Sequence, residues 1–295
     1  MRIQNSERLG WRPDIPDWLD HKYEDHLSPC PTLHINALKN FGDLALSPYA
    51  VMVPGFSKLK PWNQGQTSSC VGCSVSKMDQ LITGLSPRSA LHVYYEARRL
   101  INETEMDQGS YIRDAMKVIS TLGSGRSAYW PFDESKVLVD PADKEDRDAA
   151  KHKVLTYTRA EMIGESQHCL ETGHPYVTGL TVYDNFMTET TARSGVVTLP
   201  SGTDRQVGGH ALLFGGRDPN FRESGWAQSL IANGYPASAI PEIVRVGLNS
   251  WGDWGRGGFF VVDERYQANP DLADDTWTAR KNAKAAPVAP VAPAA

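Results

Sequence analysis

The sequence predicts an α+β fold, with helices in the first half of the chain and strands in the second. Three stretches between residues 70 and 122 carry apolar residues at helical spacing, and short β-type runs separated by turn residues dominate beyond about residue 170. Helices followed by strands favour α+β over alternating βαβ units. The 295 residues are 40% hydrophobic and 22% charged, as expected of one large domain or two closely packed subdomains.

The composition also excludes several classes of function. The formal net charge is −5, and lysines and arginines do not cluster as a nucleic-acid surface requires. The sequence has no run of 18 apolar residues that could span a membrane, and its first 18 residues lack the apolar core of a secretory signal. Four cysteines are too few for a disulfide framework in a chain of this length. We therefore expect a cytoplasmic protein with no nucleic-acid partner and no membrane partner.

The two ends of the chain differ in composition from its middle. Residues 1–61 are rich in prolines and turn formers, which predicts an extended leader with little regular structure, packed on the rest of the chain. Residues 279–295 form an Ala/Pro-rich tail that we expect to be flexible. Residues 62–278 are expected to form the functional domain, with a helical half at about 62–165 and a strand-rich half at about 166–265. An assembly partner could bind through the leader or the tail.

The predicted helices and strands follow from spacing and stop signals. The first helix covers residues 70–83, where apolar residues recur at helical spacing before Gly84. The second begins at Ser86-Pro87, a favourable helix start, and the third covers about 111–122. The predicted strands are Val177–Tyr183, Val196–Leu199, His210–Phe214, Ile243–Leu248 and Gly258–Val262.

Three positions in this framework could carry chemistry. Cys70 lies where a loop gives way to the first helix, and the partial positive charge of a helix N-terminus stabilises a thiolate. His210 begins an apolar strand behind two glycines, and Asn249 ends a strand before Ser-Trp-Gly. Each residue alone is compatible with a structural role, because a cysteine on an amphipathic helix is usually a small buried hydrophobe.

Taken together, these segments resemble the active-site blocks of papain-like cysteine peptidases. The matching segments follow one another in the family's order: Asn63–Cys70, Gly208–Ala211 and Asn249–Gly252. The separation of the cysteine and the histidine is within the family's range. The resemblance covers about residues 60–265 and is closest in style to prokaryotic and phage members.

The resemblance implies a papain-like fold. A helical subdomain would pack beside an antiparallel β-barrel-like subdomain, with the active site in the cleft between them. It also implies hydrolysis of peptide or isopeptide bonds in a polypeptide substrate through a thioester on Cys70, with His210 as base and acid. Asn249 would orient His210, and the Gln64 side chain would donate to the oxyanion. No cofactor and no metal are implied.

The resemblance further assigns residues around the cleft. Gly109 and Ser110 align with the segment that binds the substrate backbone. Trp251 would cover the Asn249–His210 hydrogen bond and is grouped with the substrate-binding residues. Residues 217–242 form an insertion that we expect at one end of the cleft.

Around the nucleophile the sequence departs from the family pattern. Thr67 replaces a cysteine that normally forms a disulfide, Ser68 replaces a glycine, and Val71 replaces a tryptophan. The leader carries no long amphipathic helix of the kind found in the family's inhibitory propeptides, so we expect residues 1–50 to be retained as a structural wrap.

Several alternatives stay open at this point. The chain could be a weak or inactive papain-like component of a phage particle or another large assembly, and then virion-associated. It could also be an acyltransferase or deamidase, because amines resolve thioesters as well as water does. Cys70 and Cys73 have the spacing of a thioredoxin-like pair, but the βαβ context of such sites is missing. A disulfide between these two cysteines could instead silence the enzyme reversibly.

Overall fold

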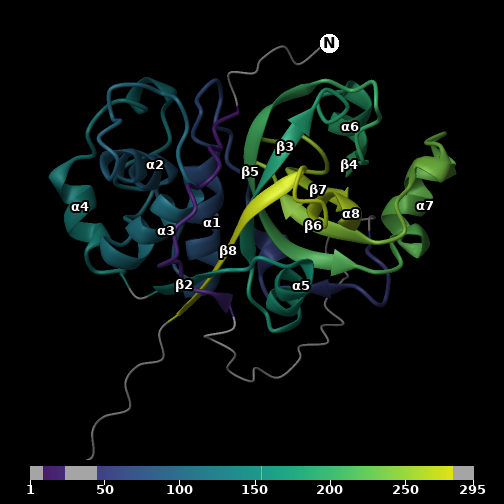
Figure 1. The fold of residues 1–295 in the computed structure, drawn as a ribbon, viewed down its shortest axis with the longest axis horizontal. Coiled ribbons are helices and arrows are strands. Elements are labelled where there is room, and N and C mark those ends of the chain that lie inside the picture. The colour runs from purple at the N-terminus through teal and green to yellow at the C-terminus, as the bar shows by residue number, and fades with distance from the viewer. Residues whose placement is uncertain (1–8, 24–44, 154, 282–295) are drawn as a thin grey trace, which may run out of the picture.

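The computed structural model describes residues 9–23, 45–153 and 155–281, and the predictions for the tail beyond residue 281 lie outside this part. The chain forms a helical half and a sheet half that lie side by side (Figure 1). The helical half is built from three helices that contact one another: α1 (Cys70–Thr83), α2 (Ala90–Arg99) and α3 (Ile112–Thr121). The predicted α+β class is confirmed.

Helix α1 is the central helix, since it packs against α2 on one side and against strand β5 (Gln206–Asp218) on the other. It ends at Gly84, which adopts the left-handed conformation that glycine tolerates best. Close packing with α2 depends on Gly72, because a Cβ there would lie 2.5 Å from the Ala90 carbonyl oxygen. Almost every residue of α1 is buried, so its N-terminus is held rigidly between the two halves.

Helix α2 begins later than the sequence predicts. Its N-cap is Ser89, whose side chain accepts a hydrogen bond from the His92 N–H. The Ser86-Pro87 pair instead lies in an extended segment, where the Pro87 carbonyl accepts from the Ser127 N–H. The predicted start was wrong because a second serine nearer the helix supplies the cap.

The described strands form one sheet of eight strands, antiparallel except for the parallel pair β4–β7. Their order is β2-β8-β3-β5-β6-β7-β4, and β1 pairs with β5 off this path. The bounds are β1 Val51–Met52, β2 Leu155–Arg159, β3 Tyr176–Tyr183, β4 Val196–Val197, β5 Gln206–Asp218, β6 Val244–Leu248, β7 Phe259–Asp263 and β8 Ala273–Lys281.

Five of these strands, β3 to β7, lie where the sequence predicts strands. Strands β2 and β8 were not predicted; β2 is the edge strand and pairs over its whole length with residues 277–281 of β8. Strand β8 also runs three residues past the expected domain end at residue 278. Its buried residues are Asp275 and the run of residues 277–279, two of them polar and none alternating cleanly with exposed positions, so the sequence carries no period-two signal here.

Five further helices cover the sheet and the ends of the helical half. They are α4 (Asp143–Ala149), α5 (Ile163–Glu171), α6 (Glu189–Ser194), α7 (Gly225–Ala232) and α8 (Glu264–Gln267). None of the helices in the described ranges is long and apolar enough to cross a membrane.

The insertion at residues 217–242 carries α7 and lies on the outer side of the sheet half, away from α1, α2 and α3 (Figure 1). The expectation that it borders the cleft is therefore wrong. Trp226 holds it there, because its fully buried indole N–H donates to the Ser194 carbonyl at 3.0 Å. The Trp226 backbone N–H donates to the Ala45 carbonyl.

The described leader residues 9–23 run between the two halves, seen as the purple segment in the middle of Figure 1. This segment is extended and pairs with the chain only at Trp11, opposite Ser110, and at Lys22, opposite Arg159. The leader thus has little regular structure, as its composition predicts.

Candidate active site

The loop before α1 fixes the position of Cys70, the first residue of the helix. The Thr67 hydroxyl donates to the Gln64 carbonyl at 2.7 Å and lies 2.7 Å from the Ser69 hydroxyl. These bonds tie the loop to itself at the position where the family pattern has a disulfide. Cys70 is fully buried, and its sulfur accepts a hydrogen bond from the Ala211 N–H at 3.5 Å.

The sheet places His210 and Asn249 together. His210 lies in β5, and Asn249 directly follows the neighbouring β6, which pairs with β5 through Leu213 and Leu248. The His210 Nε2 atom lies 2.9 Å from the Asn249 side-chain oxygen. Because an amide oxygen only accepts, Nε2 carries the hydrogen in this pair. The buried His210 Nδ1 makes no hydrogen bond with the described residues.

Trp251 covers this histidine. Continuing the antiparallel register of β5 and β6 past Leu248 brings Trp251 opposite His210, and the two rings stack with centroids 4.5 Å apart. Phe186 and Trp254 pack edge-on against Trp251. This aromatic group keeps water away from the His210–Asn249 hydrogen bond. The assignment of Trp251 to substrate binding stays a prediction.

Gln64 links the two halves at the other side of Cys70. Its fully buried side chain accepts from the Ser250 hydroxyl at 2.5 Å and donates to the Thr67 carbonyl at 2.7 Å. Its backbone N–H donates to the Ser250 carbonyl. The residue after Asn249 therefore fixes Gln64 beside the loop that leads into Cys70.

The Gly109-Ser110 segment is held on the helical side of the cleft. The Tyr94 hydroxyl, from α2, donates to the Asp107 carboxylate at 2.6 Å and accepts from the Gly109 N–H at 3.0 Å. The same carboxylate accepts from the Ser68 N–H at 3.0 Å. The loop before Cys70 is thus anchored to the Gly109-Ser110 segment through the Ser68 backbone N–H, a bond that the glycine of the family pattern could also donate.

The leader occupies the space between these groups. The Trp11 N–H donates to the Gly209 carbonyl, the Ser110 N–H donates to the Gly10 carbonyl, and the Arg12 N–H donates to the Ser110 carbonyl. A Cβ on Gly10 would lie 1.9 Å from the Ser68 carbonyl oxygen, so only glycine fits there. The leader therefore lies directly over Cys70, between the residue before His210 and the Gly109-Ser110 segment.

Burial favours the neutral forms of the Cys70 thiol and the His210 imidazole. Burial raises the pKa of the Cys70 thiol to about 11, although the N–H groups of Ala211 and Gly10 favour the thiolate. Burial also lowers the pKa of His210 to about 4, against the effect of the Asn249 hydrogen bond. In this closed state the site holds a thiol and an imidazole, and a thiolate–imidazolium pair is disfavoured.

The sequence did not reveal what holds the leader in place. Asp275 accepts from the Trp11 indole N–H at 3.0 Å and from the Asp14 N–H at 2.6 Å. Arg159 pairs with Asp275 at 2.9 Å, and the Arg113 N–H donates to the Asp14 carboxylate. We call Trp11, Asp14, Arg113, Arg159 and Asp275 the leader lock. No periodicity connects residues 11 and 275, so only the three-dimensional structure brings them together.

Cys73 does not form the thioredoxin-like site that its spacing suggested. The segment before α1 is a loop rather than a strand, so the βαβ context is absent. Cys70, Cys73 and Cys169 are all free and buried, and Cys30 lies outside the described residues. The Cys73 sulfur lies 3.8 Å from the Ser69 hydroxyl. A regulatory disulfide between Cys70 and Cys73 stays a prediction.

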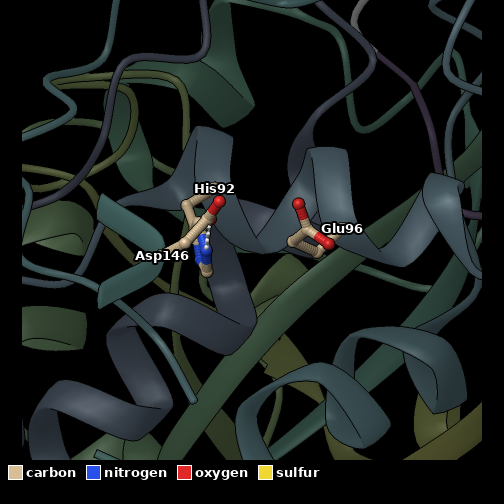
Figure 2. Close-up of side chains that lie close together, drawn as sticks. All are labelled: His92, Glu96 and Asp146. Atoms are coloured by element: carbon tan, nitrogen blue, oxygen red, sulfur yellow. Dashed lines mark ion pairs between the residues drawn. The ribbon is translucent and has the colours of Figure 1, made fainter. Parts of the chain in front are cut away.

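A second cluster of ionisable side chains lies on the helical half, between α2 and α4. Figure 2 shows His92, Glu96 and Asp146, whose ligand-type atoms all lie within 4.8 Å of one another. His92 and Asp146 form one ion pair at 3.3 Å, and Arg99 lies 3.5 Å from the Glu96 carboxylate as a second. The arginine already supplies a positive charge to this cluster, so two ion pairs account for it.

Comparison with known proteins agrees with this architecture. No family model matches the chain. An uncharacterized peptidase C1-like protein of Acanthamoeba polyphaga mimivirus is 28% identical over 199 residues, which cover 64% of this chain and 57% of the relative. The chain thus spans somewhat more than half the length of the curated relative it matches.

Two solved structures share the fold. Xylellain, a cysteine protease from Xylella fastidiosa, has a TM-score of 0.74 and 24% identity, and the match covers 96% of this chain and 99% of xylellain. Procathepsin B from Trypanosoma congolense has a TM-score of 0.59 and 11% identity over 95% of this chain and 88% of its own. The papain-like fold expected from the sequence is confirmed. The matched proteins come from a virus, a bacterium and a trypanosome, which leaves the prokaryotic or phage style a prediction.

Proposed function

We propose that this chain, which has the papain-like fold, is a cysteine peptidase that cleaves polypeptides and is closed by its own leader. One observation carries the proposal. The buried His210 is hydrogen-bonded through Nε2 to Asn249 and keeps Nδ1 unpaired among the described residues, and the next residue, Ala211, donates its N–H to the Cys70 sulfur. A thiol, a base and a group that orients the base thus meet at one site.

The reaction starts when the Cys70 proton moves to His210 Nδ1. The N-terminus of α1 and the Ala211 N–H stabilise the resulting thiolate. Asn249 holds the Nε2 hydrogen and so keeps the ring in the plane needed for transfer. Departure of the leader admits water and substrate, which removes much of the burial that disfavours the charged pair.

The thiolate then attacks the carbonyl carbon of the scissile bond. The negative charge that develops on the carbonyl oxygen would be met by the Cys70 backbone N–H and by the Gln64 side-chain amide. His210 returns its proton to the departing amine, and water hydrolyses the thioester with His210 acting as base. The carboxylic acid product leaves, and the thiol is restored.

The leader would block this reaction rather than undergo it. Gly10 directs its N–H toward the Cys70 sulfur, and its carbonyl accepts from Ser110. An attackable peptide must instead present a carbonyl carbon to the sulfur and its oxygen to the oxyanion donors. Gly209 and Ser110, which would bind a substrate backbone, are both engaged by the leader.

The test is hydrolysis of a fluorogenic peptide mixture by the full chain carrying Trp11→Ala, which weakens the leader lock. We expect hydrolysis that disappears with Cys70→Ala in the same background and persists with Cys73→Ala, the matched buried thiol three residues away. Hydrolysis that survives Cys70→Ala would overturn the proposal. The intact mass of the wild-type chain after incubation would show separately whether the leader is retained.

The same assay separates the two other functions. An added amine that diverts the acyl group into an amide product would indicate an acyltransferase, because the amine then outcompetes water for the thioester. No turnover of any peptide, with a folded protein and an unreactive Cys70, would favour the scaffold of a larger assembly.

A further inference from the structure

The loop that leads into Cys70 and the segment at Gly109 are joined by one chain of hydrogen bonds that passes through Asp107. The Gly109 N–H donates to the Tyr94 hydroxyl at 3.0 Å, and this hydroxyl donates to the Asp107 Oδ1 atom at 2.6 Å. The Asp107 Oδ2 atom accepts from the Ser68 N–H at 3.0 Å. Because an ionised carboxylate only accepts hydrogen bonds, it binds both donors at once. Asp107 therefore bridges the loop and the segment.

The helical half holds this bridge in place. Tyr94 is fully buried in α2, and a Cβ on Gly72, in the first turn of α1, would lie 2.6 Å from the Tyr94 Cβ. The Arg98 guanidinium lies 4.1 Å from the centre of the Tyr94 ring and donates at 2.7 Å to the carbonyl of Met106, the residue before Asp107. One buried arginine thus supports both side chains of the bridge, and close packing fixes the bridge against α1.

Both ends of the bridge lie at positions that the proposed reaction uses. Ser68 lies two residues before Cys70, whose backbone N–H would meet the developing oxyanion. Ser110, directly after Gly109, offers the N–H and the carbonyl that the leader now binds and that a substrate backbone would use. The separation between the oxyanion donor and the bound substrate backbone therefore depends on Asp107.

The charge of Asp107 does not itself help the nucleophile. Burial raises the pKa of the Cys70 thiol, and the negative charge of Asp107 raises it further. The N–H groups of Ala211 and Gly10 act in the other direction and favour the thiolate. A role of Asp107 through its hydrogen bonds and a role through its charge therefore predict effects of opposite sign on the reaction.

We infer that Asp107 is a positioning residue of the proposed peptidase, which holds the loop before Cys70 and the substrate-binding segment at the separation that attack requires. The inference rests on the proposed function and deepens it. A displacement of about 1 Å between reacting groups can lower a rate about 100-fold. Loss of the bridge should therefore slow the reaction although every group that reacts is still present.

The first readout is peptide hydrolysis by the full chain carrying Trp11→Ala, with rates expressed per reactive Cys70 thiol. Asp107→Asn keeps the shape of the side chain, but its NH₂ group faces either the Ser68 N–H or the Tyr94 hydroxyl. We expect kcat/KM to fall roughly 10- to 100-fold through both a lower kcat and a higher KM. The pH profile of Cys70 alkylation should shift to lower pH, so a weaker nucleophile does not explain the loss. A lower kcat with unchanged KM, or a faster reaction, would overturn the inference.

Two further variants separate the hydrogen bonds of the bridge from its charge. Tyr94→Phe removes the hydroxyl that binds the Gly109 N–H and keeps Asp107 charged, so KM should rise about tenfold while the pH profile stays in place. Glu105→Gln removes an exposed carboxylate two residues from Asp107 and should change neither quantity. An unchanged KM in a folded Tyr94→Phe variant, or a Glu105→Gln effect as large as that of Asp107→Asn, would contradict the bridge.

A labelling readout keeps the inference testable if no peptide is cleaved. In the full chain carrying Trp11→Ala, an epoxide joined to a peptide would use the Ser110 backbone, whereas iodoacetamide needs only the Cys70 sulfur. Asp107→Asn should slow labelling by the peptide epoxide roughly tenfold or more and leave labelling by iodoacetamide as fast or faster. Equal slowing with both reagents, or with neither, would overturn the inference. This difference in a chain that cleaves no peptide would contradict only the peptidase proposal.

Discussion

The proposed catalytic centre and the leader lock are both buried, but their polar groups are accommodated in opposite ways. At the centre, Cys70 and His210 are fully buried, with a hydrogen bond from the Ala211 N–H to the Cys70 sulfur and one between His210 and Asn249. Burial favours the neutral form of both groups. The lock instead buries charged groups that are paired and hydrogen-bonded, such as Arg159 with Asp275. One segment thus performs two tasks, since the leader covers Cys70 near Gly10 and is held there by contacts made elsewhere, at Asp275.

The lock also contains more negative than positive charge. Asp14 faces Asp275, and the neighbouring Asp20 pairs with both Arg113 and Arg159. With Asp20 and with Asp274, which lies 3.0 Å from Arg159, the two carboxylates of the lock become four carboxylates around two guanidiniums. Burial and the repulsion of Asp275 raise the pKa of Asp14 to about 7. The stability of the closed state should therefore depend on pH through Asp14, a residue of the lock and not of the site around Cys70.

The largest expected effect lies at the centre. Cys70→Ala or His210→Ala in the Trp11→Ala background should lower peptide hydrolysis on the order of 10⁴-fold or more, because the nucleophile or its base is lost. The thermal transition should change little for Cys70→Ala. Steady-state hydrolysis rates of these variants check this, with Cys73→Ala as the control. A Cys73→Ala variant as inactive as Cys70→Ala would contradict the assignment of Cys70 as the nucleophile.

The next effect lies at the lock. Trp11→Ala removes a buried indole together with its hydrogen bond to Asp275, which should cost about 3–5 kcal/mol of leader docking. The rate of Cys70 alkylation should then rise on the order of 100-fold. Trp18→Ala is the matched control, since this tryptophan of the same leader segment is 88% exposed and its loss should leave the rate unchanged. Equal acceleration by both variants would mean that Trp11 does not hold the leader.

A smaller, graded effect is expected from pH. Because the pKa of Asp14 is raised in the closed state, a proton stabilises that state fully below about pH 4, and the stabilisation is lost as pH rises through about 7. Opening should therefore become more favourable with rising pH, by at most about tenfold per pH unit for one proton. The groups that face Asp14 are Asp275, Arg113 and Trp277.

Hydrogen exchange of the Trp11 and Asp14 amides measures this opening, since both N–H groups are bonded in the closed state. Their protection factors should fall between pH 5 and pH 8 in the wild type and stay nearly flat in Asp14→Asn. Protection that rises with pH would reverse the sign and refute the electrostatic account of the lock.

The smallest effect is expected from Arg12. It pairs with Glu103 and donates to the Tyr111 hydroxyl at 2.8 Å, but the side chains of Arg12 and Glu103 are 31% and 37% exposed. Exposed ion pairs contribute about 0–1 kcal/mol. Arg12→Ala should accelerate Cys70 alkylation less than about fivefold. An effect as large as that of Trp11→Ala would contradict the claim that buried contacts hold the leader more strongly than exposed ones.

The sequence predicted the site best where the candidate residues lie within short local motifs. The segments around Cys70, His210 and Asn249 predicted three residues that the structure brings together. Cys70 starts α1 and Asn249 follows β6, whereas His210 lies inside β5, which begins four residues earlier than predicted. The start of α2 was misplaced by three residues because Ser89 competes with Ser86 as a cap. The position of the 217–242 insertion was missed because the buried Trp226 is anchored by residues outside the insertion, through hydrogen bonds to the Ser194 and Ala45 carbonyls.

The leader lock could not be predicted from local patterns. Trp11 and Asp275 are bonded across 264 positions of the chain, and the glycines at 179 and 209 are unremarkable residues of apolar strands until the indole is placed between them. Such contacts depend on the path of an extended segment, which carries no periodic signal. The composition predicted an extended leader, but not that it would pass through the cleft.

The central claim is that Cys70 and His210 form a working pair that the leader closes, and labelling by a cysteine-directed epoxide probe tests it most directly. The account predicts slow labelling of the wild-type chain at neutral pH under reducing conditions, fast labelling of Trp11→Ala at Cys70 alone, and loss of that labelling when His210→Ala is added. Equal labelling of the wild type and Trp11→Ala, or labelling that survives His210→Ala, would contradict it.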